Sequence, residues 1–293
     1  MSYLKNLWSN IRYLMLYSLR ERERTLLYDG LNRVEDIYKY EIKNGDVEET
    51  LDILNYDQTI DLLLENPKSF CRFGDGEIDI IQGRNIAFQE YNSKLARELE
   101  NILKSDKEEL YIGINYNLFH SSKNFSEYTR KFYLIDVKKY RDYLLSVCKR
   151  KKTYIAAGFN QLYMCVENYD FSVYYGKILK LFEGRDIVIF CGKGILDHLQ
   201  YDVFQKAKSV EYVYGDSMNA YKEYEKLLEK ALQYPKEKTL CFILGPTSKV
   251  LVYELSQKGY CAWDIGHMAK DYDAYMQHKE KSDEEIINFF APD

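Results

Sequence analysis

Residues 71–77 carry two carboxylates, Asp75 and Glu77, which are one residue apart and flanked by glycines. The glycines let the backbone bend sharply and leave space for a ligand to approach it. If the stretch is extended, the two carboxylates share a face and converge on one point. That arrangement suits a hard divalent cation, which prefers oxygen ligands. A turn followed by a helix, with Glu77 in the first turn where the helix dipole favours an acid, explains the same residues equally well.

The elements that must position these acids are short apolar runs that alternate with stretches of helical periodicity from Ser69 onward. We expect strands at 69–71, 109–114, 153–157, 186–191, 210–214, 239–244 and 260–265. We expect helices from 77 and at 93–104, 201–206, 220–232 and 249–257. Continuous apolar strands that alternate with helices predict an α/β fold, in which helices cover both faces of a mostly parallel sheet.

Four loops that follow predicted strands carry residues suited to a ligand. This position matters because open α/β sheets bind ligands beyond the carboxyl ends of their strands. The first loop holds Asp75 and Glu77. The second holds Lys193 between two glycines, where the cation can meet a phosphate. The second loop lacks the spacing of a P-loop, and a tight turn with a solvated lysine fits it equally well.

The third loop, 245–248, offers free backbone N–H groups and the hydroxyls of Thr247 and Ser248 at a helix N-terminus. It suits a diphosphate, or the hydroxyls serve only as an N-cap. The fourth loop places Asp264 and His267 after a strand, either as part of a site or as a surface turn. Together the four loops predict a ligand site, and their acids, lysine and helix N-terminus suit a metal-bound diphosphate.

Several of these segments resemble, in order and spacing, the GT-D-type glycosyltransferases, bacterial enzymes of adhesin glycosylation and surface-polysaccharide assembly. The segments are residues 72–77, 219–221, 244–251, 259–260 and 264–267, within a resemblance that runs from about Phe70 to Tyr275. The resemblance implies a Rossmann-like domain that binds a nucleotide-diphosphate sugar, typically UDP-glucose, with Mn²⁺ or Mg²⁺ held through the acidic motif. Carried over, Asp75 and Glu77 become the metal and diphosphate residues.

The chain departs from the family pattern in two places. Many members carry Thr-Arg-Pro-Tyr where this chain has Ile-Ala-Ala-Gly-Phe at 155–159, and Ser-Arg where it has Ile195 and Leu196. The loss of these cations near the donor leaves the sugar and the nucleotide open. Lys193 is a candidate to replace one of them.

The expected function is that of a metal-dependent glycosyltransferase, which moves a sugar from a nucleotide-diphosphate donor to a glycan or glycoprotein acceptor. On the resemblance, the donor is typically UDP-glucose, although the two departures leave the sugar and the nucleotide open. Asp75 and Glu77 would hold the metal, which stabilises the leaving group. If the enzyme inverts, Asp79 or Asp264 is the candidate base. The candidate donor-binding residues are Arg72, Gly74, Lys193, Asn219, Gly245, Thr247, Ser248 and His267.

Two of these residues have two candidate roles each. Arg72 would orient the acids or contact a phosphate, because its planar fork suits either partner. His267 would be a third metal ligand or a diphosphate contact.

Two other classes of function stay open. A metal-dependent phosphohydrolase or phosphotransferase can use the same acidic loop, although it usually needs more carboxylates than the strand ends offer here. A non-catalytic scaffold can dock through the predicted helix at 3–24. Transfer of a sugar, release of phosphate and absence of donor binding separate the three classes.

Composition narrows the location and the partners. A net charge of −5 argues against general nucleic-acid binding, which needs a basic face. The six cysteines are dispersed and have no metal-binding spacing. No signal peptide is evident, and no apolar stretch is long enough to span a bilayer. We therefore expect a cytoplasmic protein with reduced cysteines.

Three divisions of the chain are expected: a helical extension at 1–66, a catalytic domain at 67–278 and a C-terminal tail at 279–293. Within the extension we expect helices at 3–24, 32–43 and 47–65. The first of these helices has Trp and Leu on one face and mainly basic residues on its flank. It either lies on the inner face of an anionic membrane or packs on the main domain or a second subunit, as in a homo-oligomer.

Overall fold

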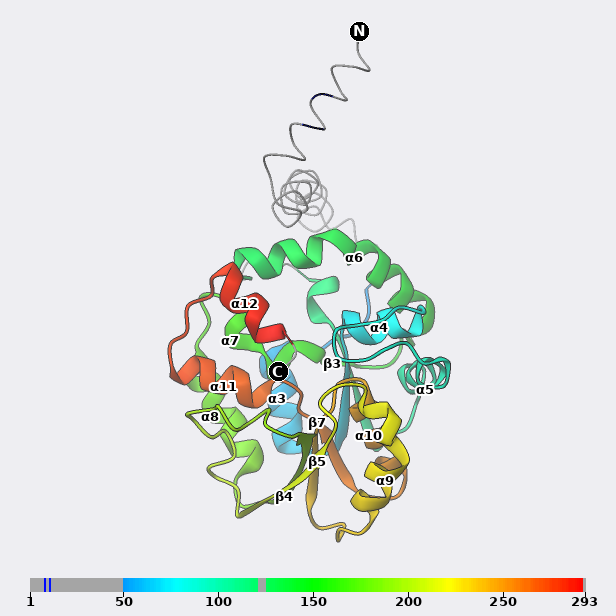
Figure 1. Cartoon of the computed structure of the whole chain (residues 1–293), viewed down its shortest axis with the longest axis vertical. Helices are drawn as coiled ribbons and strands as arrows, with labels where there is room; N and C mark the ends of the chain where they lie inside the picture. Colours follow the sequence, from blue (N-terminus) through cyan, green and yellow to red (C-terminus); the bar gives the residue numbers. More distant parts are fainter. Residues whose placement is uncertain (1–7, 9–10, 12–49, 121–124, 292–293) are drawn as a thin grey trace.

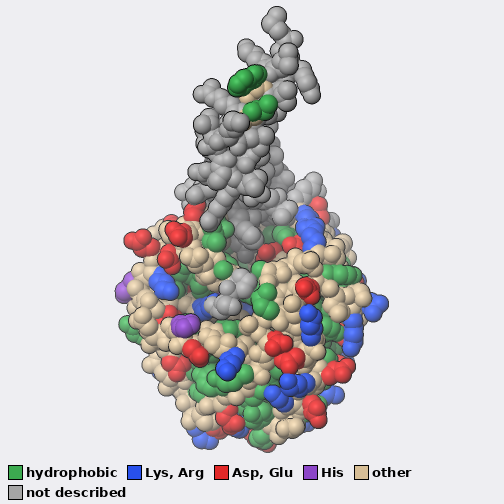
Figure 2. Space-filling model, viewed as in Figure 1, with side chains coloured by type: hydrophobic (Ala, Val, Ile, Leu, Met, Phe, Trp, Pro, Cys, Tyr) green, Lys and Arg blue, Asp and Glu red, His purple; other side chains and the backbone are tan. Residues whose placement is uncertain are grey.

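The computed structural model describes residues 8, 11, 50–120 and 125–291 of the chain. The helix predicted at 32–43 lies outside these residues, as does the one at 3–24 apart from Trp8 and Ile11. Among the helices described, none combines the length and the apolar character that a bilayer crossing requires. On the face shown in Figure 2, basic and acidic side chains of the described residues are interspersed.

Within the described residues, seven parallel strands form one sheet in the order β3-β2-β1-β7-β6-β4-β5 (Figure 1). Their bounds are β1 Ser69–Phe73, β2 Leu110–Ile114, β3 Ile155–Ala156, β4 Asp186–Gly192, β5 Ser209–Gly215, β6 Thr239–Ile243 and β7 Cys261–Asp264. Each predicted strand is present, and the sheet confirms the predicted α/β class. β1 pairs with β2 and β7 in the interior of the sheet, and all its residues are buried.

Helices cover both faces of the sheet (Figure 1). One face carries α4 (Asp75–Ile81), α5 (Ser93–Leu103), α9 (Tyr224–Leu232) and α10 (Thr247–Gln257). The other face carries α3 (Tyr56–Glu65), α7 (Leu162–Cys165), α8 (Phe171–Phe182) and α11 (Met268–Met276). The remaining helices are α6 (Glu127–Val147), α12 (Asp283–Phe290) and the 3-10 turns Tyr116–Leu118, Ala157–Asn160 and Ala220–Glu223.

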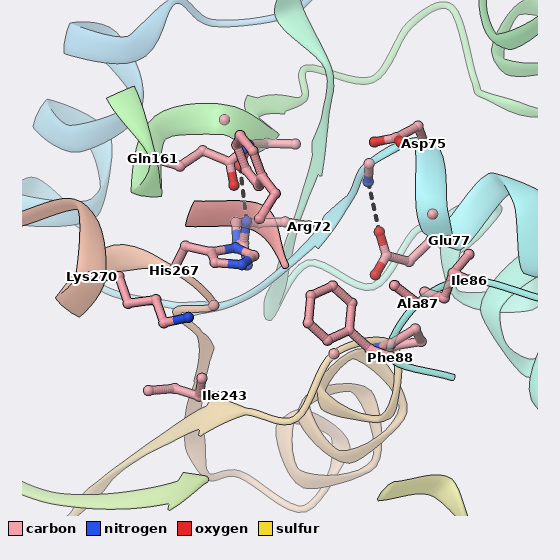
Figure 3. Close-up of a pocket in the computed structure, with 18 of the residues that line it drawn as sticks. Arg72, Asp75, Glu77, Ile86, Ala87, Phe88, Gln161, Ile243, His267 and Lys270 are labelled. Atoms are coloured by element: carbon pink, nitrogen blue, oxygen red, sulfur yellow. Dashed lines mark hydrogen bonds between the residues drawn. The ribbon is translucent and has the colours of Figure 1, made fainter. Parts of the chain in front are cut away.

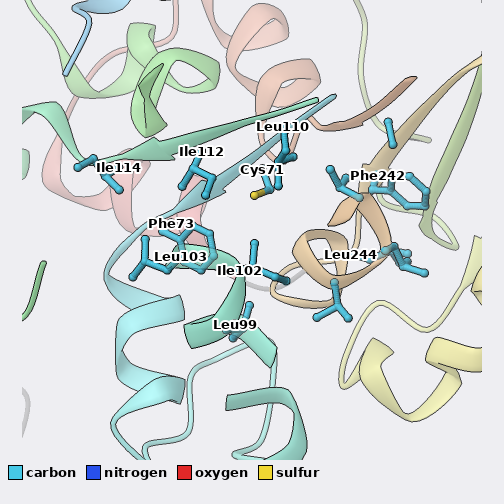
Figure 4. Packing of buried hydrophobic residues seen from close by; sticks show 14 of the residues in the cluster. Cys71, Phe73, Leu99, Ile102, Leu103, Leu110, Ile112, Ile114, Phe242 and Leu244 are labelled. Carbon is cyan, nitrogen blue, oxygen red and sulfur yellow. The ribbon is translucent and has the colours of Figure 1, made fainter. Parts of the chain in front are cut away.

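Two hydrophobic clusters form the core, one on each face of the sheet. β1 sends Cys71 and Phe73 into the first cluster, which Figure 4 shows, and Phe70 into the second. In the second cluster the ring of Phe70 stacks on Trp263 of β7 at 5.6 Å. Because successive strand residues point to opposite faces, Arg72 leaves β1 on the same side as Phe70.

The helix predicted at 47–65 is shorter in the structure and begins at Tyr56. The side chain of Asn55 accepts a hydrogen bond from Gln58 N, and the side chain of Gln58 accepts one from Asn55 N, both at 2.9 Å. This capping box fixes the start of the helix at Tyr56. Residues 50–55 are therefore outside the helix.

The helix predicted at 201–206 is wrong, because these residues form turns. Side chains bind the backbone amides there. Asp273 Oδ1 accepts from Tyr201 N at 2.9 Å, and Asp202 Oδ1 accepts from Phe204 N at 2.7 Å. These bonds, one from the remote Asp273 and one from the neighbouring Asp202, compete with the backbone hydrogen bonds of a helix.

Five helices, α6, α7, α8, α11 and α12, were not predicted. The segment 279–293, expected as a tail, contains α12, whose Ile286 is fully buried against Met164 and Ala274. At the other end, α3 packs on α8, and its Ile60 belongs to the second core cluster. The structure thus packs both α3 and α12 onto the α/β domain.

Candidate active site

A cavity of about 630 Å³ lies at the carboxyl edge of the sheet (Figure 3). Every strand contributes a lining residue within three positions of its end. From β3 to β5 across the sheet, these residues are Ala157, Asn115, Gly74, His267, Gly245, Ile195 and Ser217. The cavity lies where the sequence predicts it, because parallel strands bring all their carboxyl-end loops to one edge.

The acids Asp75 and Glu77 lie in the first turn of α4, and both line the cavity. The stretch is not extended, so the interpretation as a turn followed by a helix is correct. Glu77 Oε2 accepts a hydrogen bond from Gly74 N at 2.9 Å, which satisfies one of the free amides at the helix N-terminus. The helix dipole favours both acids at this position.

Lys249 lies between two buried carboxylates and was missed by the sequence analysis. Its Nζ is 2.8 Å from Glu77 Oε1 and 3.1 Å from Asp264 Oδ2, and its side chain is only 5% exposed. Burial works to lower the pKa of Lys249, but the two carboxylates outweigh burial and raise it above its usual value. Lys249 in the cavity wall therefore stays protonated and positively charged at neutral pH.

Asp264 is the acid at the centre of this network. Its Oδ1 accepts from Arg72 Nη2 and its Oδ2 from Lys249 Nζ, each at 3.1 Å. Burial works to raise the pKa of Asp264, but the charges of Arg72 and Lys249 outweigh it and hold the pKa below its usual value. A carboxylate held in its ionised form is a weak base. These contacts therefore favour a positioning role for Asp264 over the expected role of catalytic base.

Arg72 joins β1 to β7 and to the 3-10 turn after β3. Its Nε donates to Asp264 O at 2.8 Å, and its Nη1 donates to Asn160 Oδ1 at 2.6 Å. Gly266 leaves room for the guanidinium: a Cβ at Gly266 would lie 2.1 Å from Arg72 Nη2, and its φ of +45° favours glycine. Arg72 therefore orients Asp264 and, through it, Lys249.

Asp75 is a carboxylate of the cavity wall. No lysine or arginine in the described part of the chain forms an ion pair with it. Burial, followed by the charges of Glu77 and Asp79, raises the pKa of Asp75 to about 6. A carboxylate in such surroundings is stabilised by a cation that binds beside it, so Asp75 fits the expected metal.

A metal bound at Asp75 would need ligands from outside the protein. Within residues 50–120 and 125–291, no three His, Cys, Asp or Glu side chains gather as a metal site. Divalent cations that take oxygen ligands commonly complete their shell with phosphate oxygens and water. The donor set here therefore fits a cation that arrives with a diphosphate.

His267 lies among aromatic rings. Its ring centroid is 5.3 Å from that of Phe289 and 5.5 Å from that of Phe290, both in α12, and 6.3 Å from that of Phe88. Burial first, and then the charge of Lys270, lowers the pKa of His267 to about 3. The imidazole is therefore neutral near pH 7 and can accept a hydrogen bond or bind a metal.

Lys270 is the lysine of α11 that lines the cavity, and it was not predicted. In Figure 3 its side chain extends from the start of α11 toward the cavity, on the same side as His267. The predicted cation, Lys193, is exposed and does not line the cavity. The sequence carried no signal for Lys270, because a lysine within a helix is usually solvated.

Of the other predicted donor-binding residues, Gly74 and Gly245 line the cavity, whereas Asn219, Thr247 and Ser248 do not. Ser248 Oγ accepts a hydrogen bond from Leu244 N at 2.9 Å, within the turn that opens α10. Thr247 is fully buried. The start of α10 therefore reaches the cavity through Gly245 and Lys249, and not through the two hydroxyls.

Comparison with known proteins decides the family. The family model for the glycosyltransferase GT-D fold matches residues 70–286. The chain belongs to the GT-D glycosyltransferase family. The match confirms the resemblance drawn from the sequence, and it extends from β1 to Ile286 of α12.

Two curated relatives of this GT-D chain come from streptococci. Probable glycosyl transferase Gly of Streptococcus gordonii is 31% identical over 238 residues, which are 80% of this chain and 35% of the relative. Glycosyltransferase GlyD of Streptococcus pneumoniae serotype 4 is 27% identical over 262 residues, which are 88% of this chain and 31% of the relative. The chain thus spans about a third of the length of these relatives.

Solved structures share the GT-D fold. A new glycosyltransferase from Streptococcus sanguinis aligns with a TM-score of 0.73 and 28% identity, over 78% of this chain and 86% of its own. A highly conserved domain with a distinct glycosyltransferase fold aligns with a TM-score of 0.73 and 29% identity, over 78% of this chain and 82% of its own. These matches confirm the predicted fold.

The two departures from the GT-D pattern also lie at this site. Ile195 and Leu196, where many members carry Ser-Arg, line the cavity as apolar residues, as do Ala157 and Gly158 of the 155–159 segment. Lys249 stands within the matching block 244–251, and that position was the signal that could have identified it.

Proposed function

We propose that the chain is a metal-dependent glycosyltransferase, which moves a sugar from a UDP-linked donor to a hydroxyl of a glycan or glycoprotein. The observation that carries the proposal is one cavity lined both by Asp75, which has no ion pair among the described residues, and by cations that include Lys249 and Lys270. A metal-bound diphosphate presents the complementary charges to both. Membership of the GT-D family and the names of the streptococcal relatives support sugar transfer as the reaction.

Different residues of the cavity would have different roles in such a reaction. Mn²⁺ or Mg²⁺ would be held by Asp75 and Glu77 and would supply Lewis-acid stabilisation of the diphosphate leaving group. Lys249 holds Glu77 in place through their 2.8 Å contact. Lys249 and Lys270 line the same cavity, and they would place positive charge beside a diphosphate leaving group that is bound there.

Apolar side chains line the cavity beside these charges. They come from the connection between α4 and α5 and from α12, and they are Ile86, Ala87, Phe88, Ile286, Ile287 and Phe290. Where a bound donor covers this apolar wall, water would be displaced, which would strengthen electrostatic interactions with the leaving group.

A phosphohydrolase or phosphotransferase is the runner-up function. Two-metal enzymes of that class hold their ions with several carboxylates. The described residues contain no such cluster at the cavity, which favours sugar transfer.

A screen of sugar nucleotides by nucleotide release tests the proposal. We expect a UDP-sugar to release UDP in the presence of Mn²⁺, chelation to stop the release, and added Mn²⁺ or Mg²⁺ to restore it. Asp75→Asn should abolish the release, whereas Asp106→Asn, at a surface acid that is 60% exposed, should not. Release of inorganic phosphate would support the phosphohydrolase, and absence of any donor binding would support the scaffold.

The cytoplasmic location and the contact expected for residues 3–24 stay predictions. We propose that this segment contacts the inner membrane face, the main domain or a second subunit. Deletion of residues 2–24, followed by liposome flotation and by sizing of the protein, separates membrane docking from oligomer formation.

A further inference from the structure

A tight turn at residues 86–89 carries Phe88 into the cavity (Figure 3). Ile86 and Gln89 form an antiparallel bridge, in which Ile86 N donates to Gln89 O at 3.0 Å, so Phe88 lies at the tip. The turn rests on the acidic motif, because a Cβ on Gly76 would lie 3.3 Å from Ile86 Cδ1. The glycine between the two acids therefore lets the turn pack closely against the start of α4.

Phe88 reaches from the connection between α4 and α5 to the ends of β6 and β7. Its ring centroid is 6.3 Å from that of His267, and a Cβ on Gly245 would lie 3.8 Å from Phe88 Cβ. In Figure 3 the ring stands between His267 on one side and Glu77 on the other. A ligand whose phosphates lie at the two acids would therefore pass beside the Phe88 ring.

Asn219, which follows β5, holds this turn in place. Asn219 N donates to Phe88 O at 2.8 Å. Asn219 Oδ1 accepts from Glu90 N at 2.7 Å and from Gln89 Nε2 at 3.3 Å. The backbone of Asn219 is left-handed, with φ 55°, a conformation that asparagine and glycine adopt more readily than other residues. Because Asn219 does not line the cavity, its contacts serve the turn and not the ligand directly.

We propose that Asn219 is a positioning residue for the donor: it holds the turn so that the Phe88 ring stacks on a ring of the nucleotide sugar. The inference rests on the glycosyltransferase function proposed above. An aromatic wall offers apolar contact to the face of a sugar or uracil ring. Without Asn219 the turn must be ordered when the donor binds, so the donor binds less tightly. The chemical step depends on other residues and is unaffected.

Substitutions of Asn219 separate its side chain from its backbone. Asn219→Gly keeps the left-handed backbone without strain and removes Oδ1, whereas Asn219→Asp keeps an acceptor oxygen. We expect Asn219→Gly to speed amide hydrogen exchange in residues 84–92 and to raise the donor KM about tenfold with kcat nearly unchanged. Asn219→Asp should keep both the amide exchange rate and the donor KM close to the values of the wild type. Asn168→Gly, the same change at an exposed asparagine with φ 54°, should alter neither.

A double-mutant cycle tests whether Asn219 acts through Phe88. Phe88→Ala should raise the donor KM by itself, and adding Asn219→Gly to it should raise the KM no further. Binding of UDP and of the UDP-sugar identifies the stacked ring. A loss of affinity shared by both ligands assigns uracil, and a loss confined to the UDP-sugar assigns the sugar.

Two results would overturn the inference and leave the glycosyltransferase function intact. They are additive effects of the two substitutions on KM, and unchanged exchange of residues 84–92 in Asn219→Gly. If the intact protein neither binds nor turns over any sugar nucleotide, the proposed function is refuted, and this inference with it.

Discussion

Lys249 Nζ lies 2.8 Å from Glu77 Oε1, and this contact joins the first turns of α4 and α10. The two side chains are only 5% and 11% exposed. Lys249 also binds Asp264, so removal of the Lys249 charge leaves Glu77 buried without a cation and takes one of two cations from Asp264. The residues that line the cavity therefore also stabilise the fold.

Lys249→Met should lower the free energy of unfolding by about 3–5 kcal/mol, because Glu77 then stays buried without a cation and Asp264 keeps only Arg72. Lys258→Met is the matched control at the other end of α10, where Lys258 lies 4.0 Å from Glu254 at the surface. Loss of such an exposed pair should change the free energy of unfolding by less than about 1 kcal/mol. Urea denaturation measures both values, and equal losses in the two variants would contradict the network.

Asp75→Asn and Glu77→Gln should both remove the rise in Tm that UDP with Mn²⁺ gives to the intact protein. Without ligand, the two substitutions should change the Tm in opposite directions. Burial and the charge of Glu77 raise the pKa of Asp75 to about 6, so its ionised form destabilises the free protein above that pH. Asp75→Asn should therefore raise the Tm of the free protein, whereas Glu77→Gln breaks the pair with Lys249 and should lower it.

Thermal melts at neutral pH, with and without UDP and Mn²⁺, measure all four values. A ligand-induced rise that persists in both variants would show that the metal is held elsewhere.

Asp271, a buried acid of α11, predicts a pH dependence of stability. It accepts hydrogen bonds from Tyr163 N at 2.9 Å and from Tyr175 Oη at 2.6 Å. Burial outweighs these bonds and raises the pKa of Asp271 from 3.8 to about 6. The folded protein thus binds this proton more tightly than the unfolded chain does. The stabilisation is complete below the lower pKa and is lost as the pH rises through the higher one.

The difference in free energy of unfolding between the wild type and Asp271→Asn isolates this group from the other acids. As the pH rises from 3.8 to about 6, the free energy of unfolding of the wild type should fall relative to that of Asp271→Asn. Urea titrations across this interval measure it, and a constant difference would contradict the raised pKa.

Gly266→Ala should cost the protein at least about 3 kcal/mol, because displacing Arg72 leaves Asp264 buried without one of its partners. The added Cβ would lie 2.1 Å from Arg72 Nη2, at a φ of +45°. Gly184→Ala is the control, since Gly184 has a φ of +71° and no atom within 4 Å of the added Cβ. The control should lose only the left-handed strain, about 1–2 kcal/mol. Equal losses in urea denaturation would show that the room at Gly266 is not needed.

Most of the sheet could be predicted because its signals are local. The residues of β4 and β6 are almost continuously apolar, and both strands are buried on both faces. The prediction of a helix failed where a side chain from a remote segment binds the backbone, as Asp273 does at Tyr201. Helix α12 was missed because its burial against Met164 becomes visible only when the chain is folded.

The sequence by itself determined the strands, the edge of the sheet where the cavity lies, and the resemblance that identifies the family, whereas it left the conformation at the two acids open. These features depend on neighbouring residues, or on a rule that all parallel strands obey. Only the tertiary structure decided that Lys249 pairs with Glu77, that no described lysine or arginine pairs with Asp75, and that Asn219 contacts a turn. Charge pairing and burial depend on distances between segments remote in the chain, and local sequence patterns do not encode those distances.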